Sequence, residues 1–259
     1  VQLKDIEQEE YEKITKAIVF CMNSSDLKNN RTKSSQLERL LLERKRIIHK
    51  AENKKSVFQR IVREEFKKRG TLAYTLVYVP EGIEPNYTDM DVSNESDEEL
   101  ALINKYTAIV SSVDRSIMVK QYTSKSGSRD AILDDFKDGK THVLTSMKCL
   151  DEGVDVPRSE LAIFCASTGN PRQFIQRRGR VLRLAEGKDM AVIHDLVVIP
   201  HSQSKDQEVR SVDQNLVRNE LSRVVNFAFL SENKMTTFIE LEDICENYGL
   251  NLFEIHSNL

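Results

Sequence analysis

The chain has 259 residues, of which 39% are hydrophobic, and a net charge of −3, so it is long enough for one large domain or for a core domain with appendages. Its apolar runs fall far short of the roughly 20 residues that span a membrane. No charged-then-apolar leader opens the sequence, and we expect a soluble globular protein without membrane contact. Because the first residue is Val1 rather than Met, we expect the chain to be part of a longer protein.

Cysteine and histidine are too scattered to suggest a metal centre or a disulfide framework. The four cysteines include no CxxC pair, and the five histidines show no metal-ligand spacing. We therefore expect buried free thiols in a reducing compartment and a cytoplasmic location. No metal site built from protein side chains alone is expected.

The first seventy residues are predicted to form three helices that carry no catalytic motif. Residues 4–23 place apolar side chains at the three- and four-residue spacing of one helical face. A second helix follows with Ser34 or Ser35 as its N-cap. The third helix covers about residues 55–68 and ends at Gly70.

Charge is unevenly distributed along the chain. Residues 31–69 contain 14 Lys or Arg against 5 Glu, whereas residues 81–100 contain 8 acidic residues and no Lys or Arg. The basic excess fits phosphate contacts or the solvated face of long helices, and charge alone favours the solvated face. The acidic segment is predicted as a loop without a recognisable motif.

From Tyr74 onward, short β-branched and aromatic runs alternate with helical segments. This alternation predicts an α/β fold, with a parallel sheet and crossover helices. We therefore expect a helical linker or extension at 1–70, the α/β domain at 71–200 and a C-terminal helical extension at 201–259. The predicted strands are 75–80, 116–123, 141–146, 161–167 and 189–199, and the later predicted helices are 97–112, 128–139, 171–183, 212–230 and 237–248.

Three polar loops follow predicted strands. They are YTSKSGSRD (122–130), TSMKCLDEGVDVP (145–157) and STGNPRQ (167–173). Ligands of parallel α/β sheets gather at the carboxyl ends of the strands, so all three loops are expected at one edge. This convergence predicts a functional site there.

The segment QFIQRRGRVLR (173–183) carries four arginines directly after the turn GNP. Asn170 is a natural N-cap for this helix, and Pro171 suits its first position. A solvated amphipathic helix would be the plain interpretation, and the spacing of the polar residues decides against it.

Gln176, Arg180 and Arg183 are four and three residues apart, so a continuous helix would place them on one face. Two guanidiniums beside a glutamine amide suit a polyanion such as a transferring phosphoryl group. Gly179 costs a helix about 1 kcal/mol relative to alanine, which indicates that another body approaches the backbone there. Arg177 and Arg178 point elsewhere and are expected to orient the helix or meet carboxylates.

In LDEGVDVP (150–157), Gly153 permits close backbone approach and Asp155 can accept hydrogen bonds from a sugar hydroxyl. A plain acidic turn between two strands fits this stretch equally well on its own.

Together these segments resemble the motifs of superfamily 2 helicases of the DEAD/DEAH type, in that family's order. QRRGRVLR (176–183) resembles the final motif, SMKCLDEGVDVP (146–157) the one before it, and TLVYVP (75–80) and QYTS (121–124) the two earlier ones. The resemblance covers about residues 71–200 and implies a RecA-like helicase C-terminal domain. Within that superfamily, this chain most resembles the bacterial and phage-type DNA helicases of restriction and repair.

For the nucleotide, the resemblance implies that Arg180 and Arg183 are arginine fingers on the γ-phosphate of ATP. It also implies that the residues nearest the nucleotide, with Asp155 by the ribose, are Gln176, Gly153, Asp155 and Gly179.

For the nucleic acid, the resemblance implies contacts along the backbone of the bound strand. Many members have threonine where this chain has Met147, and that threonine couples strand contact to the nucleotide, so the departure weakens the strand assignment but not the fingers. The implied contact residues are Thr123, Ser124, Ser146 and Lys148.

A phosphate-cradling GxxxxGK followed by Ser or Thr is absent from the sequence. Asp134 stands where the first glycine would precede Gly139–Lys140, and Gly187–Lys188 is followed by Asp189. The sequence thus predicts the second motor domain of an ATP-dependent DNA helicase or translocase, inactive alone. ATP with Mg²⁺ would be bound mainly by the N-terminal motor domain of the same full-length chain.

Two alternatives stay open. A helicase-like module without catalysis could bind nucleic acid or a protein partner, although such a module need not keep Gln176, Arg180, Arg183 and Asp155 together. An RNA helicase is the other alternative, because nothing in the loops recognisably reads the 2′-hydroxyl. DNA as the partner therefore rests on the resemblance.

Overall fold

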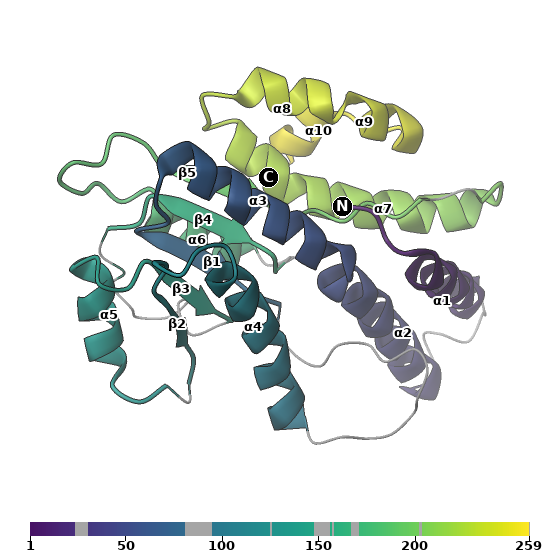
Figure 1. Cartoon of the computed structure of the whole chain (residues 1–259). Helices are drawn as coiled ribbons and strands as arrows, with labels where there is room; N and C mark the ends of the chain where they lie inside the picture. Colours follow the sequence, from purple (N-terminus) through teal and green to yellow (C-terminus); the bar gives the residue numbers. More distant parts are fainter. Residues whose placement is uncertain are drawn as a thin grey trace. The chain divides into compact units, whose positions relative to one another are not determined.

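The computed structural model describes residues 1–23, 31–80, 95–124, 126–147, 156, 158–166, 171–201 and 204–258. By its contacts the chain divides into two compact units. One unit combines Val1–Ala51 with Val197–Leu259, and the other is Glu52–Leu196. Each unit is described separately (Figure 1).

The unit Glu52–Leu196 is built on a five-stranded, all-parallel sheet in the order β2-β3-β1-β4-β5. Its central strands are near-continuous apolar runs, as expected of a parallel sheet covered on both faces. Leu76, Val77, Leu144 and Ile163 are fully buried. The strands are β1 (Thr75–Tyr78), β2 (Val119–Tyr122), β3 (Val143–Ser146), β4 (Leu161–Phe164) and β5 (Val192–Asp195).

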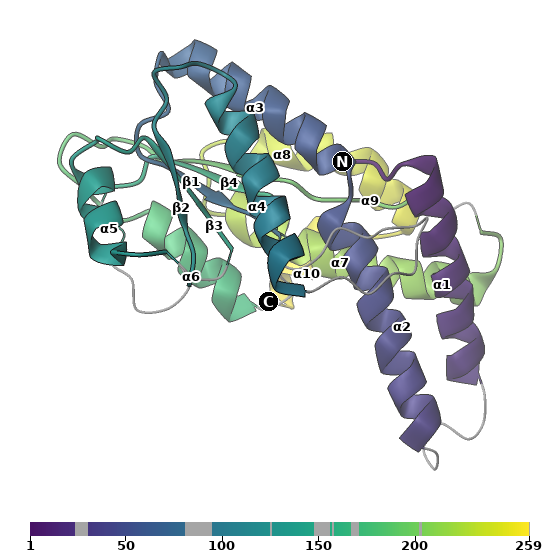
Figure 2. The ribbon, with the colours of Figure 1, turned by 60° about the horizontal axis from the view of Figure 1, so that its bottom comes forward.

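Helices cover both faces of this sheet. Figure 2 shows α3 (Asn53–Arg69) and α4 (Glu95–Ser111) on one side of the strands and α5 (Arg129–Lys137) and α6 (Pro171–Val181) on the other. Side-chain contacts agree, since Thr107 of α4 bonds Thr145 of β3 at 2.9 Å between the hydroxyl oxygens. The predicted α/β class with a parallel sheet and crossover helices is confirmed.

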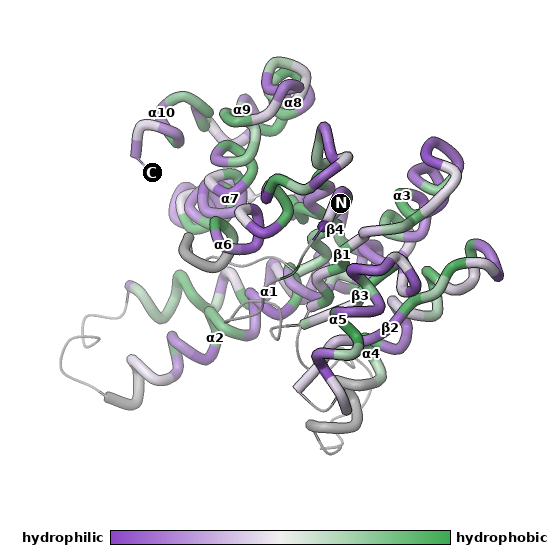
Figure 3. Tube along the Cα trace, turned by 90° about the vertical axis from the view of Figure 1, so that its left-hand side faces the viewer, coloured by the Kyte–Doolittle hydropathy of each residue, from purple (hydrophilic) through white to green (hydrophobic). Residues whose placement is uncertain are grey.

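The other unit is helical, with α1 (Asp5–Asn23) and α2 (Arg31–Lys50) packed around a shared apolar core. Apolar and polar stretches alternate along α2 (Figure 3), so one stripe of the helix faces the core. A second core lies between α7 and the short C-terminal helices. The C-terminal helices are α7 (Gln207–Ala228), α8 (Lys234–Glu240), α9 (Glu242–Tyr248) and α10 (Leu252–Ser257).

The compact units differ from the predicted division at 70 and 200. Helix α3 belongs with the sheet, because its Glu65 forms a hydrogen bond with His194 of β5, with 3.0 Å between Oε1 and Nε2. The first two helices belong instead with the C-terminal ones, where Val1 donates to the Val197 carbonyl at 2.7 Å. Three-dimensional contact, rather than order along the chain, sets these units.

Several predicted boundaries were wrong. Ser34 and Ser35 lie inside α2, which begins at Arg31, so neither is its N-cap. The predicted helix 237–248 is two helices, since the chain turns at Leu241, whose N–H bonds the Phe238 carbonyl three residues back. The helix α10 was not predicted.

Cys21, Cys165 and Cys245 are buried free thiols, whereas Cys149 lies outside the described residues. In the described part of the chain, no helix is long and apolar enough to cross a membrane. The same residues include no group of three or more His, Cys, Asp or Glu that could hold a metal ion.

Candidate functional site

The register of the sheet aligns the carboxyl ends of all five strands. Tyr78 is the partner of both Ser146 and Phe164, Ser146 also pairs with Tyr122, and Phe164 pairs with Asp195. The described strand ends that precede the three polar loops therefore lie at one edge, as the sequence predicted. This edge is the candidate site.

The arginine helix α6 follows β4 and begins at Pro171, as predicted, while its predicted N-cap Asn170 lies outside the described residues. The polar face expected from the spacing is only partly present. Gln176 is exposed, but Arg180 keeps only 9% of its surface exposed. The helix ends at Val181, so Arg183 lies beyond it and is exposed in the following turn.

Within the described part of the chain, a Cβ built on Gly179 would meet no atom within 4 Å. Gly179 is also exposed. The close approach predicted at this glycine would therefore have to come from a body outside these residues.

Arg177 anchors α6 to the sheet edge. Its side chain is 4% exposed, and its guanidinium lies 4.9 Å from the centroid of the Tyr78 ring. The Tyr78 ring in turn packs at 4.9 Å from the ring of Phe164. A cation stacked on an aromatic face contributes on the order of 1 kcal/mol or more when desolvated, so this contact fixes how the helix sits on the edge.

Arg178 is partly buried on α6. Partial burial lowers the pKa of its guanidinium, since desolvation disfavours the charged form. Its carbonyl accepts the Leu182 N–H at 2.9 Å in the last turn of the helix. The sequence predicted an orienting role for Arg177 and Arg178, and the contact of Arg177 with Tyr78 is of that kind.

A buried lysine at the start of α3 reaches the same edge and was not anticipated from the sequence. Lys54 has no exposed surface and donates from Nζ to the Cys165 carbonyl at 3.1 Å. Burial raises the pKa of the Cys165 thiol well above its usual range, so the thiol stays protonated. No sequence pattern marks Lys54, because only the packing of α3 on β4 brings it to this carbonyl.

The loop after β2 contains Thr123 and Ser124, two residues predicted to contact the bound nucleic-acid strand. Thr123 donates its N–H to the Ser126 hydroxyl at 2.9 Å and accepts Arg129 Nε at 3.3 Å on its carbonyl. Thr123 is half-buried in this turn, while Ser124 is exposed. Ser124 is thus the more accessible of the two.

Ser146 ends β3 with no exposed surface, and its Oγ has no hydrogen-bond partner among the described residues. A buried hydroxyl cannot touch a bound strand in this conformation. Met147 beside it is half-buried. The other predicted positions Gly153, Asp155 and Lys148 lie outside the described residues.

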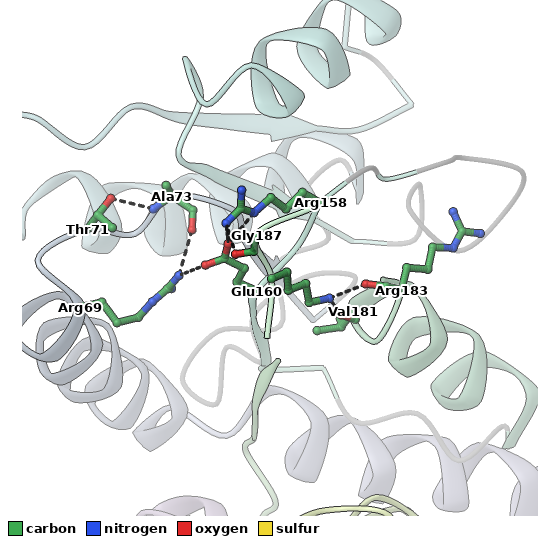
Figure 4. A network of polar contacts seen from close by, with 9 residues as sticks. Arg69, Thr71, Ala73, Arg158, Glu160, Val181, Arg183 and Gly187 are labelled. Atoms are coloured by element: carbon green, nitrogen blue, oxygen red, sulfur yellow. Dashed lines mark hydrogen bonds and ion pairs between the residues drawn. The ribbon is translucent and has the colours of Figure 1, made fainter. Parts of the chain in front are cut away.

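The amino edge of the sheet holds a structural network instead (Figure 4). Glu160 accepts Arg69 at 2.9 Å and Arg158 Nε at 2.6 Å, while Arg158 also donates to the Gly187 carbonyl at 3.0 Å. The Arg158 guanidinium stacks over the Tyr74 ring at 4.5 Å. These bonds join the end of α3, the start of β4 and the turn after α6.

Fold and site define an α/β domain in which the strand ends that precede the polar loops share the carboxyl edge of a parallel sheet. Residues 93–185 match the family model "Helicase conserved C-terminal domain". This region of the chain therefore matches the conserved C-terminal domain of helicases.

Named relatives agree with this family. The chain is 35% identical over 88 residues to "DNA 3'-5' translocase XPB2" of Sulfurisphaera tokodaii, covering 33% of the chain and 20% of that protein. It is 36% identical over 86 residues to "Putative ATP-dependent helicase IRC3" of Saccharomyces cerevisiae, covering 32% and 12%. The aligned region is thus a fifth or less of these relatives.

Similar solved structures include the Hef helicase domain of Pyrococcus furiosus, with 20% identity, a TM-score of 0.37, and 76% and 36% of the two chains covered. Another is a fragment of a putative HsdR subunit of a type I restriction enzyme from Vibrio vulnificus. Its identity is 22%, its TM-score 0.40, and the coverage 55% and 26%.

Proposed function

We propose that this chain is the second motor domain of an ATP-dependent DNA helicase or translocase. The observation that carries the proposal is the helix α6 itself, with Gln176 exposed on the helix, Arg180 one turn further along and Arg183 exposed two residues after its end. The partner domain would supply the phosphate-cradling loop and hold most of the ATP with its Mg²⁺. The name of one relative, "DNA 3'-5' translocase XPB2", supports DNA as the proposed substrate.

In this proposal Arg183 and Arg180 act on the nucleotide from across the cleft between two motor domains. Water attacks the γ-phosphorus, the bond to the bridging oxygen of ADP breaks, and guanidiniums stabilise the charge on the phosphoryl oxygens. Arg183 is exposed and needs no rearrangement of packing. Arg180 is largely buried, so its guanidinium has to turn outward when the domains close.

The bound nucleic-acid strand would run along the loop after β2, where Ser124 is exposed and Thr123 is half-buried. Ser146 and Lys148 belong to the same proposal, and Ser146 becomes accessible only if its surroundings move. Gly153 and Asp155 would face the nucleotide from the loop after β3.

The test compares DNA-stimulated ATP hydrolysis by the full-length protein with that of Arg180→Ala and Arg183→Ala, each measured separately. Removing an arginine finger commonly lowers the rate on the order of 10³-fold. ATP binding, measured by equilibrium titration, should persist. Arg180→Lys should also be slow, because lysine keeps the charge but lacks the planar fork.

Arg115→Ala is the matched control, since Arg115 is an exposed arginine in the turn before β2 and belongs to none of the predicted motifs. Thermal unfolding of each variant separates lost folding from lost catalysis. Unchanged turnover in both α6 variants would refute the finger roles.

A non-catalytic binding module is the second candidate, and the burial of Arg180 is the observation that favours it. A module of that kind would bind nucleic acid with no ATP turnover even in the wild-type full-length protein. Comparing binding to DNA and RNA of one sequence would decide the substrate class.

A further inference from the structure

We propose that Lys188 is a positioning residue that fixes the exit of α6 and so the direction of Arg183. This inference rests on the proposed function. Lys188 Nζ donates to the Arg183 carbonyl at 2.7 Å and to the Val181 carbonyl. One ammonium group therefore holds both the last residue of the helix and the arginine that follows it.

The bonds at the end of α6 show why this lysine matters. The last carbonyls of a helix have no partner inside it. In α6 they accept hydrogen bonds from residues outside the helix. The Arg178 carbonyl accepts Leu182 N–H at 2.9 Å, and the Arg180 carbonyl accepts the Ser159 hydroxyl at 3.4 Å. The Val181 carbonyl is bonded by Lys188, seven residues further along.

Lys188 itself is held from the amino edge of the sheet. Its N–H donates to the Ala185 carbonyl at 3.1 Å, which closes the turn. Arg158 bonds the carbonyl of the neighbouring Gly187, and Glu160 holds Arg158 (Figure 4). The turn that carries Lys188 is therefore held to the start of β4, while the ammonium group of Lys188 bonds the end of α6.

The ammonium group of Lys188 is partly shielded from water, and its pKa reflects this. Partial burial lowers the pKa of Lys188, with the nearby Glu160 raising it and Arg158 lowering it further. A cation at the carbonyl end of a helix also interacts favourably with the helix dipole. Figure 4 shows the Arg183 side chain directed away from Arg158 and Glu160, while the Arg183 carbonyl accepts the bond from Lys188.

The test measures kcat and KM for DNA-stimulated ATP hydrolysis by the full-length protein carrying Lys188→Met or Lys188→Arg. Methionine keeps an apolar stem of similar length without charge or donors. We expect Lys188→Met to lower kcat between about 10- and 100-fold, since a misplacement of about 1 Å can cost 10²-fold. We expect KM for ATP to stay within about 2-fold and Lys188→Arg to restore most of the rate, because the bonds to carbonyls are regained.

Lys140→Met is the matched control, because Lys140 is an exposed lysine of the same unit that pairs only with Asp138 in the bonds described for it. Hydrogen exchange of the backbone amides of residues 181–188 should rise in Lys188→Met and not in Lys140→Met. That readout follows the turn itself and does not depend on activity.

The outcomes separate the two proposals. If Arg183→Ala abolishes turnover but Lys188→Met leaves kcat within 2-fold, the positioning role fails and the finger role stands. A rise in KM alone, or equal losses in Lys188→Met and Lys188→Arg with unchanged hydrogen exchange, also overturns the positioning role. If Arg180→Ala and Arg183→Ala are both without effect, the proposed function fails and this inference fails with it.

Discussion

At the residue scale, the arginines of α6 divide by burial in a way that their spacing did not predict. Gln176, Arg180 and Arg183 would share a face only if the helix continued to residue 183, and it ends at Val181. Arg177, predicted to point elsewhere, is stacked on Tyr78 at the candidate edge. Helical periodicity predicts relative direction within a helix, but the helix end and its neighbours decide which guanidinium is accessible.

A buried polar cluster in the helical unit gives a prediction about stability. Tyr11 donates to Asp213 Oδ1 at 2.6 Å, and both side chains are buried. Tyr11→Phe should lower the free energy of unfolding by about 1 to 3 kcal/mol, because the buried Asp213 carboxylate loses this donor. Urea unfolding followed by circular dichroism measures this.

The control is a double-mutant cycle with Asp213→Ala. If the hydroxyl acts through Asp213, then Tyr11→Phe should cost much less in the Asp213→Ala background. Equal costs in both backgrounds would show that the bond contributes nothing to stability.

At the element scale, the long periodic helices and the apolar strands were predictable, and the short pieces were not. Helix α3 ends at Gly70, as predicted, because a left-handed residue there lets its N–H bond the Phe66 carbonyl. The strand predicted over 189–199 forms a β-strand only at Val192–Asp195. Pairing with a single neighbour, β4, limits its length, and no feature of the apolar run reveals that.

The start of α7 gives the prediction at this scale. Asp206 caps the helix, accepting Glu208 N–H at 2.9 Å and Val209 N–H at 3.4 Å. Asp206→Ala should destabilise the protein by about 1 kcal/mol, whereas Asp206→Asn should cost less because asparagine also caps. Thermal unfolding of the three proteins side by side checks the order, and an equal loss in both variants would contradict the capping role.

At the scale of the whole molecule, the sequence predicts a chain that cannot hydrolyse ATP by itself. It has no GxxxxGK followed by Ser or Thr, so the β- and γ-phosphates lack their cradle. The purified chain should show no DNA-stimulated ATP turnover, measured by phosphate release. It should bind DNA weakly, with an affinity that falls steeply with salt, because the contacts are mostly to phosphate.

The complementary measurement uses the full-length protein with its phosphate-cradling domain. It should turn over ATP under the same conditions. Substantial turnover by the purified chain would contradict the prediction. Salt-independent binding to DNA would contradict the phosphate contacts.

By itself the sequence determined the α/β class, the sheet edge that the polar loops follow and the resemblance to helicases, because alternating strands and helices and ordered motifs are local patterns. Only the tertiary structure decided that Lys54 bonds the Cys165 carbonyl at the candidate edge, that Lys188 bonds the Arg183 carbonyl after α6, and that Arg180 and Ser146 are buried. The tertiary structure also assigned α3 to the sheet and the first two helices to the C-terminal ones. These features depend on contacts between residues far apart in the chain, which burial and packing set and no local pattern encodes.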